Sequence, residues 1–170
     1  MRILTFTDLH LSETALKKIK WKSRLFQPEF LICAGDVTVF ESGLDEMLKK
    51  LNALNKKIII IHGNHEDADT FKKKCEKHKN LIFIHKDHHI HKECIVFGYS
   101  GGGFAINDPG FNKTGKKFEK IIKKNKDKKK IFVTHGPPYG TKQDYILDHH
   151  AGNKNTKNFS IKNKIDLHIC

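Results

Sequence analysis

The chain has 170 residues, of which 38% are hydrophobic, and it carries a formal charge of +13 at neutral pH. This length fits about one domain with a substantial core, and counts of 12 Gly and 4 Pro exclude a fibrous or largely disordered chain. No apolar run approaches the roughly 18 residues that suggest a membrane-spanning helix, and no signal-peptide pattern is present, so we expect a cytoplasmic protein without a membrane partner.

The positive charge comes almost entirely from lysine. Only Arg2 and Arg24 are arginine among the 32 basic residues, and the lysines are spread over every predicted helix. Because recognition of bases and phosphates favours the bidentate arginine side chain, we interpret these lysines as solvated helix surfaces. A nucleic-acid partner is compatible with the charge but not favoured, whereas an anionic substrate would be attracted.

Strand and helix patterns succeed one another along the chain, which is typical of an α/β fold. In chain order we predict a strand at 2–7, a helix capped by Ser12 that runs to about Leu25, a strand at 30–35, a helix over 44–54, a strand at 58–61, a helix at 67–78, strands at 81–84 and 94–99, a helix around 118–122, a strand at 130–135, a weak helix near 155–164 and a strand from 166. The run IIII at 58–61 is typical of a strand buried on both faces.

Four of the predicted strands are each followed by side chains that can bind a metal ion. In chain order these are Asp8 and His10, then Asp36, then Asn64 and His65, and finally His135. In α/β sheets the loops at the carboxyl ends of strands are where ligands bind. Carboxylate, imidazole and amide ligands together can hold two divalent ions bridged by one carboxylate, so the pattern indicates a site.

The motifs DLH (8–10), GD (35–36), GNHE (63–66) and THGPPYG (134–140) resemble the successive motifs of calcineurin-like metallophosphoesterases. The likeness is greatest to the small prokaryotic members described as Icc-related, or cyclic-nucleotide phosphodiesterase-like. It covers essentially the whole chain. The resemblance implies an α/β/β/α sandwich of two mixed sheets with outer helices, formed as a single domain by residues 1–170.

The resemblance also implies roles for individual residues. Asp8 and His10 bind one divalent ion, Asp36 bridges two, and Asn64 and His135 bind the second. His65 is implied as the acid that protonates the leaving oxygen, and it contacts the phosphoryl group together with Asn64. The segment DHHAGN (148–153) resembles a substrate-side loop, which makes His149 and, above all, His150 candidate phosphate contacts. Mn, Fe, Zn and Ni all suit the mixed ligands, with Mn favoured.

The implied activity is hydrolysis of a phosphate mono- or diester by metal-activated water, on a small molecule or a nucleotide. A different class of function is a weakly active or inactive scaffold that uses the same fold to bind partners. A nuclease is a third interpretation, which rests on the basic charge alone.

The end of the chain departs from the family pattern. In the family, a strand like DLHIC (166–170) is followed by Gly-His-x-His, whose two histidines complete the metal sites. We therefore expect the last strands and these two ligands to be missing, and activity to be weak. A complementing C-terminal segment or a second copy of the chain is the partner that this expectation suggests.

Two further motifs have competing interpretations. His85, His88, His89 and His91 could form a metal-binding tract, but we favour a hairpin with incidental histidines. The segment YSGGG (99–103) is either a place where the backbone approaches a substrate or a glycine turn.

Overall fold

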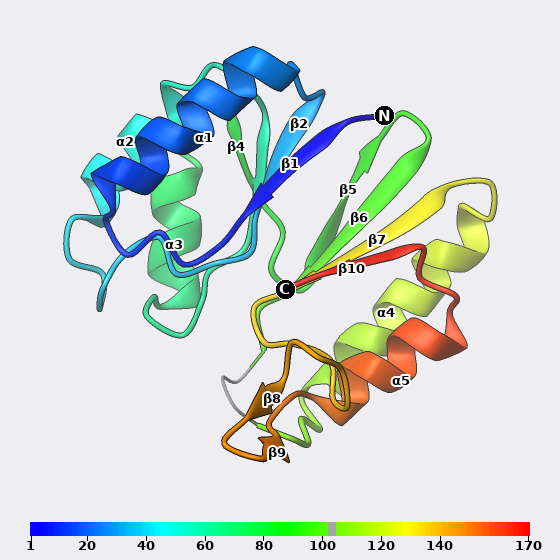
Figure 1. The fold of residues 1–170 in the computed structure, drawn as a ribbon. Coiled ribbons are helices and arrows are strands. Elements are labelled where there is room, and N and C mark those ends of the chain that lie inside the picture. Colours follow the sequence, from blue (N-terminus) through cyan, green and yellow to red (C-terminus); the bar gives the residue numbers. More distant parts are fainter. Residues whose placement is uncertain (102–104) are drawn as a thin grey trace. The chain divides into compact units, whose positions relative to one another are not determined.

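The computed structural model describes residues 1–101 and 105–170. Its elements in chain order are β1 (Ile3–Phe6), α1 (Glu13–Phe26), β2 (Phe30–Cys33), α2 (Leu44–Asn52), β3 (Ile58–Ile60), α3 (Ala68–Cys75), β4 (Leu81–Phe83), β5 (Asp87–His91), β6 (Cys94–Tyr99), α4 (Phe111–Lys124), β7 (Lys129–Thr134), β8 (Tyr145–Ile146), β9 (His149–His150), α5 (Lys154–Lys162) and β10 (Leu167–Ile169) (Figure 1). The chain divides into two compact units, Met1–His85 and Lys86–Cys170. Each unit has its own sheet with helices packed on it.

The first unit is a parallel sheet in the order β1-β2-β3-β4 with α1, α2 and α3 on one face (Figure 1). Each successive strand is added on the same side, so right-handed crossovers place all three helices together. Leu31 and Ile58 point to these helices and join their core. Every residue of β2 and β3 is buried, which confirms the prediction of a fully buried isoleucine strand.

The helices of the first unit begin beside the carboxyl ends of its strands. Ser12 accepts a hydrogen bond from the Ala15 N–H at 3.2 Å, and Asp67 accepts one from the Thr70 N–H at 2.9 Å. Such N-caps satisfy backbone donors that the helix leaves unpaired. The loops that lead into α1 and α3 are therefore fixed at their helical ends, which suits them to hold a site.

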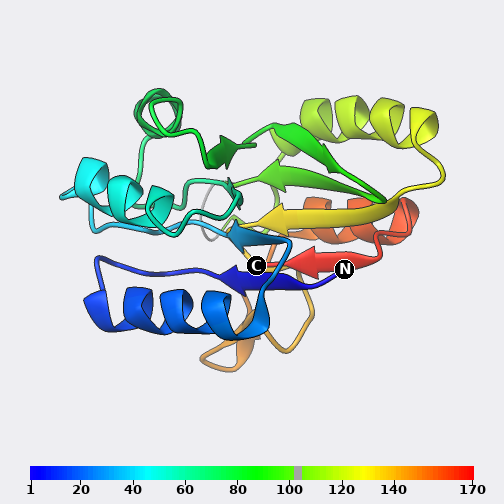
Figure 2. The ribbon, with the colours of Figure 1, turned by 90° about the horizontal axis from the view of Figure 1, so that it is seen from above.

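The second unit is a mixed sheet in the order β10-β7-β6-β5, in which β5 runs antiparallel to β6. Figure 2 shows these strands side by side, from green β5 and β6 through yellow β7 to red β10. Helices α4 and α5 lie on one face and complete a core rich in phenylalanine, namely Phe97, Phe111, Phe118, Phe132 and Phe159.

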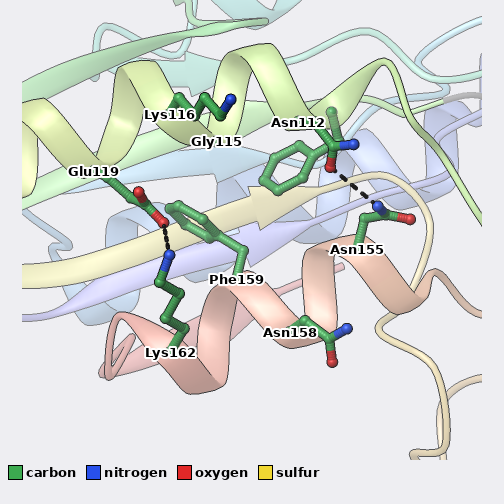
Figure 3. Close-up of a pocket in the computed structure, with 9 residues that line it drawn as sticks. Asn112, Gly115, Lys116, Glu119, Asn155, Asn158, Phe159 and Lys162 are labelled. Atoms are coloured by element: carbon green, nitrogen blue, oxygen red, sulfur yellow. Dashed lines mark hydrogen bonds and ion pairs between the residues drawn. The ribbon is translucent and has the colours of Figure 1, made fainter.

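Both apolar packing and polar contacts hold α4 and α5 together along their seam. Lys162 Nζ lies 2.9 Å from Glu119 Oε1, and Asn155 Nδ2 donates to Asn112 Oδ1 at 3.2 Å (Figure 3). Phe159 packs below them, and its ring lies 5.3 Å from that of Phe111, edge to face. The hollow of about 380 Å³ along this seam is therefore lined by groups that hold the two helices together.

The α/β prediction is confirmed, and every predicted strand and helix is present, although several ends differ by a few residues. The favoured hairpin at His85–His91 is confirmed too, since β5 pairs with β6. Two mixed sheets were expected, whereas among the described residues the first sheet is parallel throughout. The short β8–β9 hairpin was not predicted. Of the segment 99–103, Gly102 and Gly103 lie outside the described residues.

Within the described ranges, none of the helices is both long enough and apolar enough to cross a membrane.

Candidate metal centre

Three neighbouring loops of the first unit carry five of the predicted site residues. Asp8 and His10 follow β1, Asp36 follows β2, and Asn64 and His65 follow β3. Because these strands are parallel and adjacent, their carboxyl ends meet at one edge of the sheet. Asp36 is 3% exposed, whereas Asn64 is exposed at the surface of its loop.

Two glycines allow the loops after β2 and β3 to approach each other closely. A Cβ atom on Gly63 would overlap the Asp36 carboxylate, and one on Gly35 would lie 2.8 Å from the Gly63 backbone. Gly35 also has φ 106°, a conformation that other residues rarely adopt. The glycines of the GD and GNHE motifs are therefore needed to bring Asp36 beside the third loop.

The backbone at the site is left-handed at three candidate ligands. Asp8, His10 and Asp36 have φ values of 53°, 43° and 49°, which are uncommon for residues other than glycine. The Asp8 N–H donates to Gly35 O at 3.1 Å, and the His10 N–H donates to Asp36 O at the same distance. These bonds hold the strained loops together. Strain of this kind typically persists where side chains must be aimed for function.

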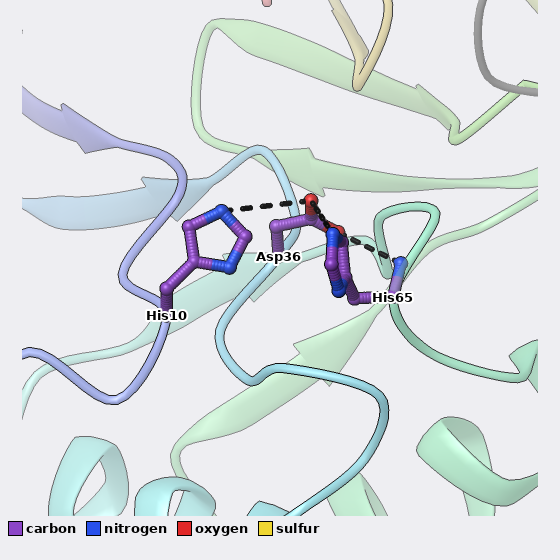
Figure 4. Close-up of side chains that lie close together, drawn as sticks. All are labelled: His10, Asp36 and His65. Atoms are coloured by element: carbon purple, nitrogen blue, oxygen red, sulfur yellow. Dashed lines mark hydrogen bonds and ion pairs between the residues drawn. The ribbon is translucent and has the colours of Figure 1, made fainter.

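His10, Asp36 and His65 form a compact group of potential ligands. Each offers one donor atom, and these atoms lie within 4.8 Å of one another. The Nε2 atoms of His10 and His65 each lie 3.8 Å from Asp36 Oδ2, and the two rings approach edge to face at 5.0 Å (Figure 4). The other Asp36 oxygen accepts a hydrogen bond from the His65 N–H at 3.0 Å.

The hydrogen-bond partners give the two histidines different tautomers. His10 Nδ1 lies 3.0 Å from the Thr38 carbonyl, which can only accept, so Nδ1 carries a hydrogen and Nε2 presents a lone pair in the neutral ring. His65 Nδ1 instead accepts from the Phe40 N–H at 3.4 Å, so its hydrogen is on Nε2. The Asp36 carboxylate thus faces two different imidazole nitrogens. His10 Nε2 carries a lone pair that can bind a metal ion, and His65 Nε2 carries a hydrogen.

The space beside His10 Nε2 suits a cation. The Nε2 lone pair lies 3.5 Å from Asp8 Oδ1 and 3.8 Å from Asp36 Oδ2, and three acceptors at such distances repel one another unless positive charge lies among them. Mixed carboxylate and imidazole donors match the preferences of divalent transition metals. A hydrogen bond from Nδ1 to a carbonyl is the usual support of a metal-binding histidine. The donor set therefore fits the metal that the motifs imply.

Glu66 organises the site, although sequence reasoning gave it no role. It is 6% exposed, and its Oε1 accepts from the Thr38 N–H at 2.8 Å and from the Thr38 hydroxyl at 2.9 Å. Its Oε2 accepts from the Gly63 N–H at 2.9 Å. One buried carboxylate therefore joins the loops after β2 and β3. The acid of GNHE was visible in the sequence, but its partner Thr38 is distant along the chain.

His135 and His150 lie in the second unit. His135 directly follows β7 and is half-buried. His150 Nδ1 donates to Asp144 Oδ1 at 2.8 Å, and its ring centroid lies 5.5 Å from that of Tyr139 and 5.2 Å from that of Tyr145. His150 and Tyr145 line an open hollow of about 530 Å³. His149 is exposed and bonds to Leu147 O of its own hairpin.

Asp144 fixes His150 and was missed by sequence reasoning. It is fully buried and accepts backbone N–H bonds from Gly140 at 2.8 Å, Thr141 at 2.7 Å and Gly152 at 3.0 Å. Burial alone would raise the pKa of this carboxyl group, but these donors and His150 hold the pKa well below its usual range. Asp144 is therefore ionised at neutral pH and favours the Nδ1–H form of His150.

In the part of the chain that the structure describes, the histidines of 85–91 belong to no group of three donor atoms close enough to hold a metal ion. His88 and His89 instead pair across the β5–β6 ladder with Phe97 and Val96. His62 is buried at the end of β3, with Nδ1 2.7 Å from Gly63 O.

Comparison with known proteins agrees with the motifs. A family model for calcineurin-like phosphoesterases matches residues 1–170, so the chain belongs to the calcineurin-like phosphoesterase family. No curated protein matches the chain.

Solved structures share the fold at low sequence identity. One superposes with a TM-score of 0.82 at 15% identity and covers 98% of this chain and 82% of its own. The protein TT1561 of Thermus thermophilus has a TM-score of 0.78 at 14% identity, with coverage of 98% and 80%. An archaeal phosphodiesterase has a TM-score of 0.50 at 18% identity, with coverage of 90% and 82%.

Proposed function

We propose that this chain is a metal-dependent phosphoesterase that hydrolyses a phosphate mono- or diester of a small molecule or nucleotide. The proposed ligands are Asp8 and His10 for one divalent ion, Asp36 for both, and Asn64 and His135 for a second. Mn²⁺ is favoured over Fe, Zn and Ni. Bound ions would neutralise charge on the phosphoryl group and make water a better nucleophile.

The observation that carries this proposal is the orientation of His10. Its Nδ1–H is engaged by the Thr38 carbonyl, so the Nε2 lone pair is directed toward two carboxylate oxygens rather than toward a hydrogen-bond donor. A neutral histidine without a bound cation gains nothing from this arrangement. A bound cation removes the repulsion among the three acceptors.

His65 is proposed as the general acid rather than as a ligand. Because its Nδ1 accepts from the Phe40 N–H, the hydrogen of the neutral ring is on Nε2, where it can form a hydrogen bond to the leaving oxygen. To act as the acid, the ring would carry a second hydrogen on Nδ1 in place of the Phe40 contact, and it would return to the neutral form after giving up the Nε2 hydrogen. The leaving oxygen of the ester would receive this proton.

His150 is proposed as a substrate contact in the second unit. Its bond to the ionised Asp144 fixes the ring and leaves Nε2 directed away from that carboxylate. Lys142 lines the same hollow and adds positive charge. A phosphate oxygen is a suitable partner for this pair.

The proposal is tested with a panel of phenyl phosphate, bis(p-nitrophenyl) phosphate, cyclic nucleotides and short RNA, each with Mn²⁺, Fe²⁺, Zn²⁺ or Ni²⁺. We expect hydrolysis that requires a metal and stops on chelation. Asp36→Asn should lower the rate about 10²-fold or more, the usual loss when a main electrostatic stabiliser is removed. The matched control is Asp127→Asn, since the Asp127 side chain is 81% exposed and pairs only loosely with Lys128, at 3.8 Å.

The panel also separates the alternatives. Absence of hydrolysis with every metal would overturn the enzyme proposal and favour a scaffold. Cleavage of RNA alone would favour a nuclease.

A further inference from the structure

Phe40 is an exposed aromatic residue held in an unfavourable backbone conformation. The residue is 78% exposed and its φ is 47°, in a turn closed by the bridge between Val39 and Ser42. A left-handed backbone is costly for a bulky residue, and an exposed ring gains little from burial. Single exposed apolar residues are common, but one that also carries backbone strain points to a function.

Phe40 contacts the proposed general acid through both its backbone and its ring. Its N–H donates to His65 Nδ1 at 3.4 Å, and its ring centroid lies 4.6 Å from that of His65, with the planes at 43°. The backbone contact explains why the turn is held close to His65. It does not explain the ring, because any residue except proline would supply the N–H.

We propose that Phe40 contacts the leaving group of the substrate, and that the site prefers esters whose leaving group is a planar aromatic alcohol or a nucleoside. The inference rests on the proposed role of His65 as the acid. A leaving oxygen bonded to His65 Nε2 lies about 3 Å from it. The group attached to that oxygen is then next to the imidazole and within reach of the neighbouring aromatic ring, which offers a stacking surface.

The test measures binding as well as turnover. Phenylphosphonate and methylphosphonate carry the same anionic group and differ in the ring, so their affinities for the Mn²⁺-loaded chain are compared by calorimetry. We expect wild type to favour the phenyl compound, and Phe40→Ala and Phe40→Gly to reduce that preference about three- to ten-fold. Affinity for methylphosphonate should be unchanged. The same change should appear in kcat/KM for phenyl against alkyl phosphates.

Controls separate this role from a structural one. Trp21→Ala removes another exposed aromatic, 59% exposed on α1, and should leave the preference intact. Lys92→Gly relieves the backbone strain of a similar residue, because Lys92 in the β5–β6 turn has a φ of 48°. Like Lys92→Gly, Phe40→Gly should keep or raise the melting temperature, because glycine adopts a positive φ without strain.

Equal preference for the phenyl compound in wild type and both Phe40 variants would overturn the inference, even if the chain hydrolyses esters as proposed. Failure of the proposed function alone would instead appear as no hydrolysis with any metal. In that case the two phosphonate affinities still decide whether Phe40 binds a ring.

Discussion

At the scale of single residues, the site depends on which nitrogen of each histidine carries the hydrogen. The sequence motifs predicted that Asp8, His10, Asp36 and His65 belong to one site, because all follow strands at the same edge. They could not predict the tautomers, which depend on Thr38 O and the Phe40 N–H. These partners are backbone groups, which almost any residue type could supply.

His65→Ala should leave metal content near that of wild type, because the proposed ligands remain. Turnover should fall by about 10² to 10⁴, the usual range for a lost general acid. The loss should shrink for p-nitrophenyl esters, whose leaving group departs without protonation. Rates for nitrophenyl and alkyl esters would be compared with metal content by elemental analysis. An equal loss for both esters would contradict the acid role, and a loss of metal would make His65 a ligand.

At the scale of elements, the parallel sheet supplies the geometry that brings the loops together. Its strands and helices were predictable because the isoleucine run and the N-cap at Ser12 are local signals. The hydrogen bonds of Glu66 to Thr38 and Gly63 could not be predicted, because they join loops that follow different strands. The β8–β9 hairpin was missed because two-residue strands leave no periodicity to detect.

Glu66→Ala should destabilise the chain by about 2 to 4 kcal/mol, since it leaves the buried N–H groups of Thr38 and Gly63 without their acceptor. Glu66→Gln retains one carbonyl oxygen and should cost less. Denaturant unfolding in the presence of a chelator measures both. Glu76→Ala is a suitable control, because the Glu76 side chain is 63% exposed and lies 3.9 Å from Lys72 Nζ in a loose ion pair. If Glu66→Ala is as stable as this control, the carboxylate does not hold the loops.

At the scale of the whole molecule, stability should depend on pH through His168. Its Nε2 lies 2.8 Å from the Thr134 hydroxyl, which itself donates to Gly136 O, and its Nδ1 lies 3.0 Å from the Ser160 hydroxyl. The neutral ring satisfies both neighbours. Burial lowers the pKa of His168 from 6.5 to about 4.

As the pH falls below 6.5, the unfolded chain binds a proton that the folded chain does not accept until near pH 4. The free energy of unfolding should therefore decrease through this window. His168→Gln should make the decrease smaller, whereas His149→Gln, an exposed control, should not. Urea unfolding at pH 7 and pH 5 measures the difference. Identical pH dependence in wild type and His168→Gln would contradict the assignment.

Asp36 is proposed as the carboxylate shared by two metal ions. The most direct measurement is a Mn²⁺ titration by calorimetry of wild type and Asp36→Asn, with folding checked by circular dichroism. We predict two bound ions for wild type and a loss of both for the variant, because one substitution removes a negative charge from each site. Asp36→Asn should remain folded, since an amide oxygen can still accept from the His65 N–H. Two ions bound with unchanged affinity by folded Asp36→Asn would contradict the claim.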